Sequence, residues 1–188
     1  MDEQSPLSYR MAGAAEARCV ASTVRLLLRR KVRLSPAYVG TRLNFADGTS
    51  ACVYRETLIE GREPATPCVL IVRFRLRLVR SGLHTLFRWE SLLNTPLFVG
   101  FPGFVNKLWL AHDEEDIYRG VYDWDGADRA EYYARSLWRV LALGCEPPSI
   151  SFRILPGLRR DDILADPHVI DVTAADAVGA WWRPVSVA

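Results

Sequence analysis

The sequence predicts an α+β fold, and three observations support this prediction. Two stretches rich in aromatic and β-branched residues are joined by a short acidic turn, His112–Asp116, which is typical of a β-hairpin. One further stretch with strand character precedes this hairpin, and another follows it. Helical patterns separate both from the hairpin. The predicted order is strand 69–78, helix 83–93, strands 104–111 and 117–124, helix 126–143 and strand 150–155. This β-α-β-β-α-β order is that of the ferredoxin-like fold, a four-stranded antiparallel sheet with both helices on one face.

Both predicted helices have recognisable ends. Leu83 and Phe87 give the first helix an apolar side, and Asn94-Thr95-Pro96 ends it. Asp125 is expected to cap the second helix, and Gly144 to follow its last turn.

Residues 1–66 are predicted to form an N-terminal extension of a helix and a hairpin. Apolar residues recur with helical spacing over 13–32. The basic run Arg25–Arg33 suits a helix C-terminus, although it could also contact anionic lipid or a partner. Asp47-Gly48 between two alternating stretches predicts a hairpin within 38–59.

The remaining boundaries divide the chain into the extension 1–66, a main domain 67–157 and a C-terminal tail 158–188. The tail contains a short run, 168–172, that is predicted to be extended. It also contains Trp181-Trp182. Two adjacent tryptophans are costly in water, so we expect the tail to dock on its own domain or on a partner subunit.

The composition is that of an ordinary globular protein. Of the 188 residues, 49% are apolar and 24% are charged, and the net charge is +2. No apolar run approaches the roughly 18 residues that a spanning helix needs. The acidic N-terminus is unlike a signal peptide. We therefore expect a cytoplasmic protein, and a bacterial one because every basic residue except Lys31 and Lys107 is an arginine.

Several classes of site have no sequence support. The cysteines show no CxxC spacing, so neither a disulfide framework nor a metal site is predicted. There is no Ser-His-Asp arrangement, phosphate loop or nucleotide fingerprint. The basic residues of the strands alternate with apolar ones, which favours ion pairs or a solvated face over nucleic-acid binding.

The alternation of side chains assigns residues to the two faces of the sheet. The predicted helix side holds Leu70, Val72, Phe74, Leu76, Phe104, Asn106, Leu108, Leu110, Tyr118, Gly120, Tyr122, Trp124, Ile150, Phe152 and Ile154. The predicted open side holds Arg73, Arg75, Arg77, Val105, Lys107, Trp109, Arg119, Val121, Asp123, Ser151 and Arg153. An open face that mixes charge and tryptophan could be solvated or covered, and a second copy of the chain is the expected cover.

The run FPGFVNKLWLAHDEEDIYRGVYDWDGADRAEYYARSLW resembles the antibiotic-biosynthesis monooxygenase-like group of the dimeric α/β-barrel superfamily. The resemblance extends from about Pro67 to Gly157. It is carried by Pro102-Gly103-Phe104, Lys107, Trp109, Gly120, Tyr122, Trp124, Ala130 and Tyr133. It implies a homodimer whose two sheets face each other, with a pocket between sheet and helices in each subunit. Members oxidise polyketide-like phenols without metal or flavin, degrade haem, isomerise lactones, or have no known activity.

Candidate site residues follow from the predicted helix side. Asn106 places an amide among apolar residues, so it either holds a loop or presents its NH₂ group to a ligand oxygen. As catalytic residues we predict Asn106 and Tyr122, both as oxyanion donors. As substrate-binding residues we predict Phe74, Trp89, Asn94, Tyr118 and Trp124.

Three functions are compatible with these residues. The first is cofactor-independent monooxygenation of an aromatic or polyketide-like compound, a hydrophobic and oxygenated small molecule. The second is binding and degradation of haem, with His84 as the candidate ligand. The third is non-catalytic binding of a small molecule, or a scaffold role for the extension and the tail.

Overall fold

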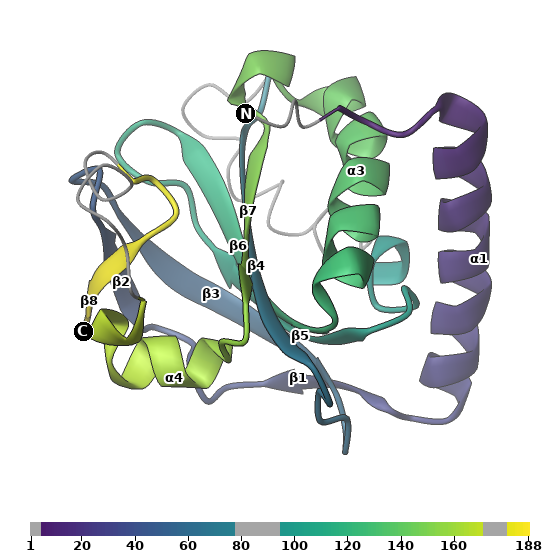
Figure 1. Ribbon diagram of the computed structural model, residues 1–188, viewed down its shortest axis with the longest axis horizontal. Helices are drawn as coiled ribbons and strands as arrows, with labels where there is room; N and C mark the ends of the chain where they lie inside the picture. The colour runs from purple at the N-terminus through teal and green to yellow at the C-terminus, as the bar shows by residue number, and fades with distance from the viewer. Residues whose placement is uncertain (1–4, 78–94, 171–179) are drawn as a thin grey trace.

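The computed structural model describes residues 5–77, 95–170 and 180–188. Within them, the chain is an α+β protein with eight strands in one antiparallel, curled sheet (Figure 1). Helices α1 (Tyr9–Leu28) and α3 (Ala127–Gly144) lie on one face, and the short helix α4 (Arg160–Ala165) lies on the other. The strand order is β7-β4-β6-β5-β3-β2-β8, and β1 also pairs with β3.

The four strands predicted for the main domain are confirmed as neighbours in this sheet. Each is antiparallel to the next, in the order β7-β4-β6-β5. They are β4 (Pro67–Arg75), β5 (Phe104–Leu110), β6 (Ile117–Asp125) and β7 (Ser151–Pro156), flanked by the single turns η1 (Thr95–Leu97) and η2 (Pro147–Ser149). The predicted helix 83–93 lies outside the described residues.

The N-terminal segment extends this sheet. The predicted hairpin is confirmed as β2 (Arg42–Phe45) and β3 (Ser50–Ile59), and its turn needs Gly48 because the φ angle there is +87°. Strand β3 pairs with β5. The helix predicted to extend to residue 32 ends at Leu28 instead, so that part of the prediction is wrong. Val32–Ser35 form strand β1 and pair with the C-terminal half of β3.

Helix α3 begins without a side-chain cap, contrary to the prediction for Asp125. The carboxylate of Asp125 instead accepts hydrogen bonds from the backbone N–H groups of Ala65 and Thr66, both at 2.9 Å. It thus fixes the link before β4. Helix α1 is capped by Ser8 and turns its small buried side chains towards α3 and the 96–101 loop.

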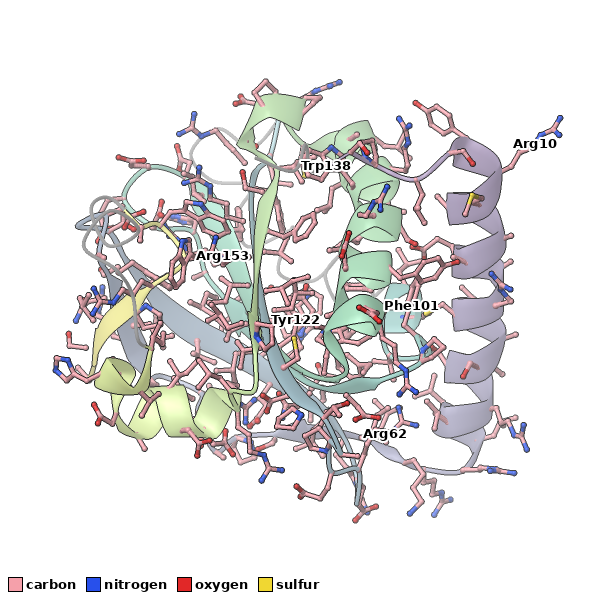
Figure 2. The ribbon with its side chains drawn as sticks, in the orientation of Figure 1. Arg10, Arg62, Phe101, Tyr122, Trp138 and Arg153 are labelled. Carbon is pink, nitrogen blue, oxygen red and sulfur yellow. The ribbon has the colours of Figure 1, made fainter. Side chains whose placement is uncertain are left out.

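The second face of the sheet is covered by the chain itself. Strand β8 (Pro184–Val187) pairs with β2, and Trp182 is buried in a core with residues of β2, β4 and α4. The guanidinium of Arg153 lies 4.8 Å from the Trp182 ring, on the side of β7 away from α3 (Figure 2). The tail therefore docks on its own domain and takes the place expected for a second copy. The tail's predicted extended run begins instead in the turn η3 (Pro167–Val169).

A β-bulge changes the sides predicted for β5. The pairing of β5 with β6 shifts between Phe104 and Asn106, where the carbonyl of Phe104 accepts a hydrogen bond from Arg62 at 2.8 Å. One extra residue reverses the alternation beyond it. Lys107 and Trp109 thus face the helices, whereas Asn106, Leu108 and Leu110 lie on the second face; their predicted sides are wrong.

Candidate functional site

A largely apolar cavity of about 170 Å³ lies between the sheet and α3. Its aromatic wall consists of Phe74, Phe98, Trp109, Tyr122 and Tyr133. The remaining wall is mainly aliphatic and comes from Leu76, Leu97, Leu137, Val140 and Leu141, with Gly144 and Cys145 at the end of α3. Lys107 is the one basic side chain among its described lining residues, and we call this space the amine cavity.

The amine of Lys107 lies against aromatic rings rather than against a carboxylate. Its Nζ is 3.1 Å from the centroid of the Trp109 ring, 4.6 Å from that of Phe98 and 4.8 Å from that of Tyr122. The residue is only 6% exposed. No ion pair of Lys107 occurs among the described residues. A buried ammonium without a counter-ion is costly, so this environment favours the uncharged amine.

Burial lowers the pKa of Lys107 well below its ordinary value of 10.5, and the charge of Arg55 lowers it further. The guanidinium of Arg55 lies 3.9 Å from the same Trp109 ring, which therefore contacts two basic side chains. The Trp109 Nε1 group donates to Thr57 Oγ1 at 3.2 Å and so keeps the ring oriented. A ring contact with an ammonium would favour the charged form, but desolvation outweighs it.

Two tyrosine hydroxyls form a polar pair beside the amine. Tyr133 Oη donates to Tyr122 Oη at 3.3 Å, and burial raises the pKa of both phenols, so both are uncharged at neutral pH. The ring of Tyr122 lies over Gly120, where a Cβ would approach its atoms to 2.8–3.1 Å. A glycine at position 120 is therefore required for this placement of Tyr122.

The polar groups continue from Tyr133 towards α1. Burial is the main cause of the raised pKa of Tyr133, and repulsion from the ionised forms of Tyr122, Glu16 and Cys19 would raise it further. Both carboxyl oxygens of Glu16 are buried without a hydrogen-bond partner in the described part of the chain, and burial raises the pKa of Glu16 to about 7. Burial likewise raises the pKa of Cys145, in the cavity wall, to about 12. Among the described lining residues, Tyr122, Tyr133 and Cys145 therefore bring no negative charge to the cavity at neutral pH.

The predicted site residues fall into four groups, of which Asn106 alone forms the last. Tyr122 and Phe74 line the amine cavity, and Tyr122 lies between the sheet and α3 (Figure 2). Tyr118 stacks on Phe74 with ring centroids 5.9 Å apart, and Trp124 is fully buried against Phe104. Both therefore support the wall from behind. Outside the described residues lie Trp89, Asn94 and His84.

The side chain of Asn106 lies on the opposite face of the sheet from that of Tyr122, because of the bulge. Its Nδ2 donates to Asp123 at 2.8 Å, and its Oδ1 accepts from the Asp123 backbone at 3.2 Å. Asp123 also accepts from the backbone N–H of Arg160, whose side chain pairs with Glu56 at 2.8 Å. This network ties α4 to the sheet beside a shallow hollow of about 390 Å³.

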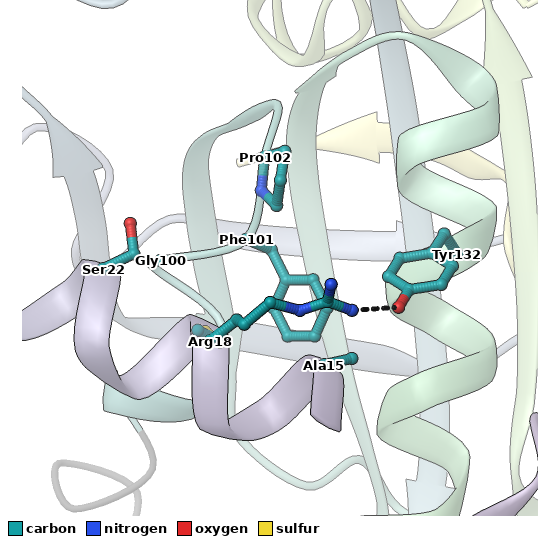
Figure 3. A pocket seen from close by; sticks show the side chains of 8 residues that line it. Ala15, Arg18, Ser22, Gly100, Phe101, Pro102 and Tyr132 are labelled. Carbon is teal, nitrogen blue, oxygen red and sulfur yellow. Dashed lines mark hydrogen bonds between the residues drawn. The ribbon is translucent and has the colours of Figure 1, made fainter. Parts of the chain in front are cut away.

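Another hollow of about 390 Å³ lies at the surface between α1, residues 100–102 and α3 (Figure 3). Arg18 donates across it to Tyr132 Oη at 3.3 Å, and the Phe101 ring forms part of its wall. Its one cation is exposed and already hydrogen-bonded. It therefore offers less for chemistry than the amine cavity.

Lys107 is the site residue that the sequence reasoning missed. A signal was present, because the chain has 24 basic residues and only two of them are lysines. An arginine stays charged in proteins, whereas a buried lysine can lose its proton. A lysine within an apolar strand of an arginine-rich chain therefore indicates a neutral amine more strongly than a lysine in an average chain.

In comparisons with known proteins, no family model, curated protein or solved structure matches the chain. The resemblance to the monooxygenase-like group therefore depends on the residues quoted for it. None of the described helices is both long and apolar enough to cross a membrane. No group of His, Cys, Asp and Glu side chains suited to a metal ion occurs within residues 5–77, 95–170 and 180–188.

Proposed function

We propose that the chain binds a small aromatic or short carbonyl-containing compound in the amine cavity, and that Lys107 takes a proton from it. The observation that carries this proposal is the position of Nζ, buried 3.1 Å from the centroid of the Trp109 ring at the cavity wall without an ion pair among the described residues. A lysine is a useful base only when its pKa approaches the working pH. Desolvation moves it in that direction.

The same geometry suits the charges that appear after proton transfer. The new ammonium stays over the Trp109 ring, where a cation is favoured, and faces the anion of the ligand. Tyr122 offers an uncharged hydroxyl to the developing oxyanion. Positive and negative charge thus arise together in a water-poor space, where their attraction is strong.

The size of the cavity limits the ligand. An apolar cavity of about 150 Å³ holds one benzene molecule. About 170 Å³ therefore suits a single substituted ring or a short chain rather than a polycyclic compound. This favours a smaller substrate than the polyketide-like one expected from the sequence, and haem binding is not proposed.

The reaction that we propose is cofactor-independent oxygenation. The phenolate that forms when Lys107 takes the proton passes an electron to O₂, and recombination makes a new C–O bond. A phenol with a free para position then gives a quinone and water: both C–H and O–H hydrogens leave in the water with one oxygen atom, and the other oxygen atom stays in the product.

The strand order supports a further proposal about the fold. The order β7-β4-β6-β5, with every pair antiparallel and α3 between β6 and β7 in sequence, is that of a ferredoxin-like unit. We propose that residues 67–157 form such a unit. Strands β3, β1, β2 and β8 then enlarge it within one chain.

The test uses 2-methylphenol as the probe, with calorimetry for binding and an oxygen electrode for turnover. We expect binding and oxygen uptake by the wild type, and product formation to fall at least about 100-fold in Lys107→Met, as is usual when a general base is lost. Lys31→Met is the matched control, because Lys31 is the other lysine of the chain and its side chain is exposed. Equal turnover by Lys107→Met and the wild type would contradict the role of Lys107.

A further inference from the structure

An uncharged amine in an apolar cavity is also a nucleophile. We propose that the side chain of Lys107 captures small aldehydes and ketones as imines, which would make the amine cavity a covalent site for carbonyl compounds. This inference depends on the proposed binding of small compounds in the same cavity. It adds a reaction, and a class of substrate, to that binding.

The position of the amine supports this reaction. Nζ borders the cavity and lies 3.1 Å from the Trp109 ring centroid, so Trp109 supports it from one side. No described carboxylate pairs with it, which leaves the nitrogen lone pair available once the proton is lost. The cavity beside this nitrogen is lined by aromatic and aliphatic side chains, among them Phe74, Leu137 and Leu141, and its volume of about 170 Å³ suits a small flat carbonyl compound.

The groups that face Lys107 keep the amine uncharged. These groups are Arg55 and Tyr54 on β3, Tyr122 on β6, Tyr133 on α3, and Cys145 directly after α3. The arginine disfavours a second positive charge. The pKa of each of Tyr122, Tyr133 and Cys145 is raised by burial, so none of these three supplies a negative charge at neutral pH. A desolvated lysine beside another cation is the arrangement that activates an amine for Schiff-base formation.

The chemical step balances with the groups present. The lone pair of Nζ attacks the carbonyl carbon, a C–N bond forms, and the C=O π electrons move to oxygen. A proton passes from nitrogen to that oxygen and gives a carbinolamine, a transfer that the Tyr122 hydroxyl can assist. Loss of the hydroxyl group with the second N–H proton releases one water and leaves the C=N bond. No oxidant or reductant is consumed.

The experiment traps the imine on the intact protein. The wild type is incubated with benzaldehyde and sodium cyanoborohydride at pH 7, and benzyl groups are then located by peptide mass mapping. The chain offers two lysines and its α-amino group for comparison. We expect Lys107 to react at least about tenfold faster than Lys31, because burial favours the uncharged amine of Lys107 and each unit by which a lysine's pKa falls raises its reactive fraction at pH 7 about tenfold.

The pH dependence separates this chemistry from simple accessibility. Between pH 7 and 9 the reactive fraction of an ordinary lysine rises by about tenfold per unit, because such a lysine is mostly protonated there. The rate at Lys107 should rise much less. Benzyl alcohol fills the same space without a carbonyl, so an excess should slow labelling of Lys107 and leave Lys31 unchanged. This competition uses the wild type and does not depend on the folding of a variant.

Matched variants complete the test. Lys31→Arg should retain the label at Lys107, and Lys107→Met should lose it while keeping its circular dichroism spectrum. Label confined to Lys31 and the α-amino group would overturn the inference. If calorimetry shows that benzaldehyde binds in the cavity but Lys107 is not labelled, imine formation fails and the proposed binding stands. If benzaldehyde neither binds nor labels Lys107, both proposals fail.

Discussion

Glu16 shows what a single buried acid does to stability. Its carboxyl oxygens have no hydrogen-bond partner among the described residues, and its pKa of about 7 lies above the ordinary 4.5 because of burial. The folded protein therefore binds a proton more tightly than the unfolded chain does. The contribution of Glu16 to stability is complete below about pH 4.5 and is lost as the pH rises through about 7.

We expect Glu16→Gln to be more stable than the wild type at pH 8 by about 1 to 2 kcal/mol, allowing for solvent screening of a partly buried group. Glutamine cannot ionise, so the gain should disappear at pH 4.5. Urea denaturation at both pH values measures the difference. A gain that is equal at pH 4.5 and pH 8 would show that Glu16 does not titrate in this way.

Single residues were also where sequence reasoning reached its limit. The alternation of β4 and β6 correctly placed Phe74 and Tyr122 towards the helices. In β5 both alternating sets contain apolar residues, so the pattern gives no sign of a slip by one position. The sequence pattern therefore could not predict the bulge. For the same reason it could not predict that Lys107, and not Asn106, lies at the cavity.

At the scale of elements, α1 is held by a close approach to the loop after η1. The Cys19 thiol and the Thr23 hydroxyl both donate to the carbonyl of Pro96, at 3.2 and 3.3 Å. At Gly100 the loop backbone meets the helix directly. A Cβ there would overlap the carbonyl oxygen of Cys19 and lie 2.7 Å from Thr23 Oγ1.

Gly100→Ala should therefore push α1 away from the loop and destabilise the protein by about 1 to 3 kcal/mol, as overpacking does elsewhere. Gly13→Ala is the matched control within α1, because a Cβ at position 13 has no neighbour within 4 Å. It should raise stability by about 0.5 to 1 kcal/mol through helix propensity. Thermal or urea unfolding compares the two, and equal effects would argue against the close contact.

At the scale of the whole molecule, the described residues form two cores, one on each face of the sheet, and the tail completes the second. Trp182 is buried there at 6% exposure, whereas Trp181 is half-buried beside Arg73, with the guanidinium 4.5 Å from its ring. A homodimer with its sheets face to face would have to displace this tail. The face of the sheet that a second copy was expected to cover is therefore covered by residues of the same chain.

Trp182→Ala should destabilise the protein by about 3 to 5 kcal/mol, because it empties a large side chain from the second core. Trp181→Ala should cost about 1 to 2 kcal/mol, since Trp181 is only partly buried against the second core and loses less packing, together with its contact with Arg73. Urea midpoints measured for both variants test this order. The reverse order would mean that the tail docks through its other tryptophan.

The sequence predicted that the tail docks, but not that it does so by pairing strand β8 with β2. Two adjacent tryptophans indicate burial wherever they lie, which is why the choice between the same chain and a partner stayed open. Strand β8 has only four residues, and its partner β2 lies near the other end of the chain. Local sequence patterns cannot predict such a pairing, because neither strand carries a signal that identifies its partner.

The pairing of β2 with β8 also bears on how the protein is made. Asn44 donates to Ser186 at 2.8 Å across 142 positions of sequence. Because a nascent chain folds from its N-terminal part as it emerges, β2 waits with one unpaired edge until synthesis reaches β8. Contacts of such long range form slowly, and an open strand edge can pair with other molecules. The pairing of β8 is therefore also the step that covers the open edge of β2 in the newly made chain.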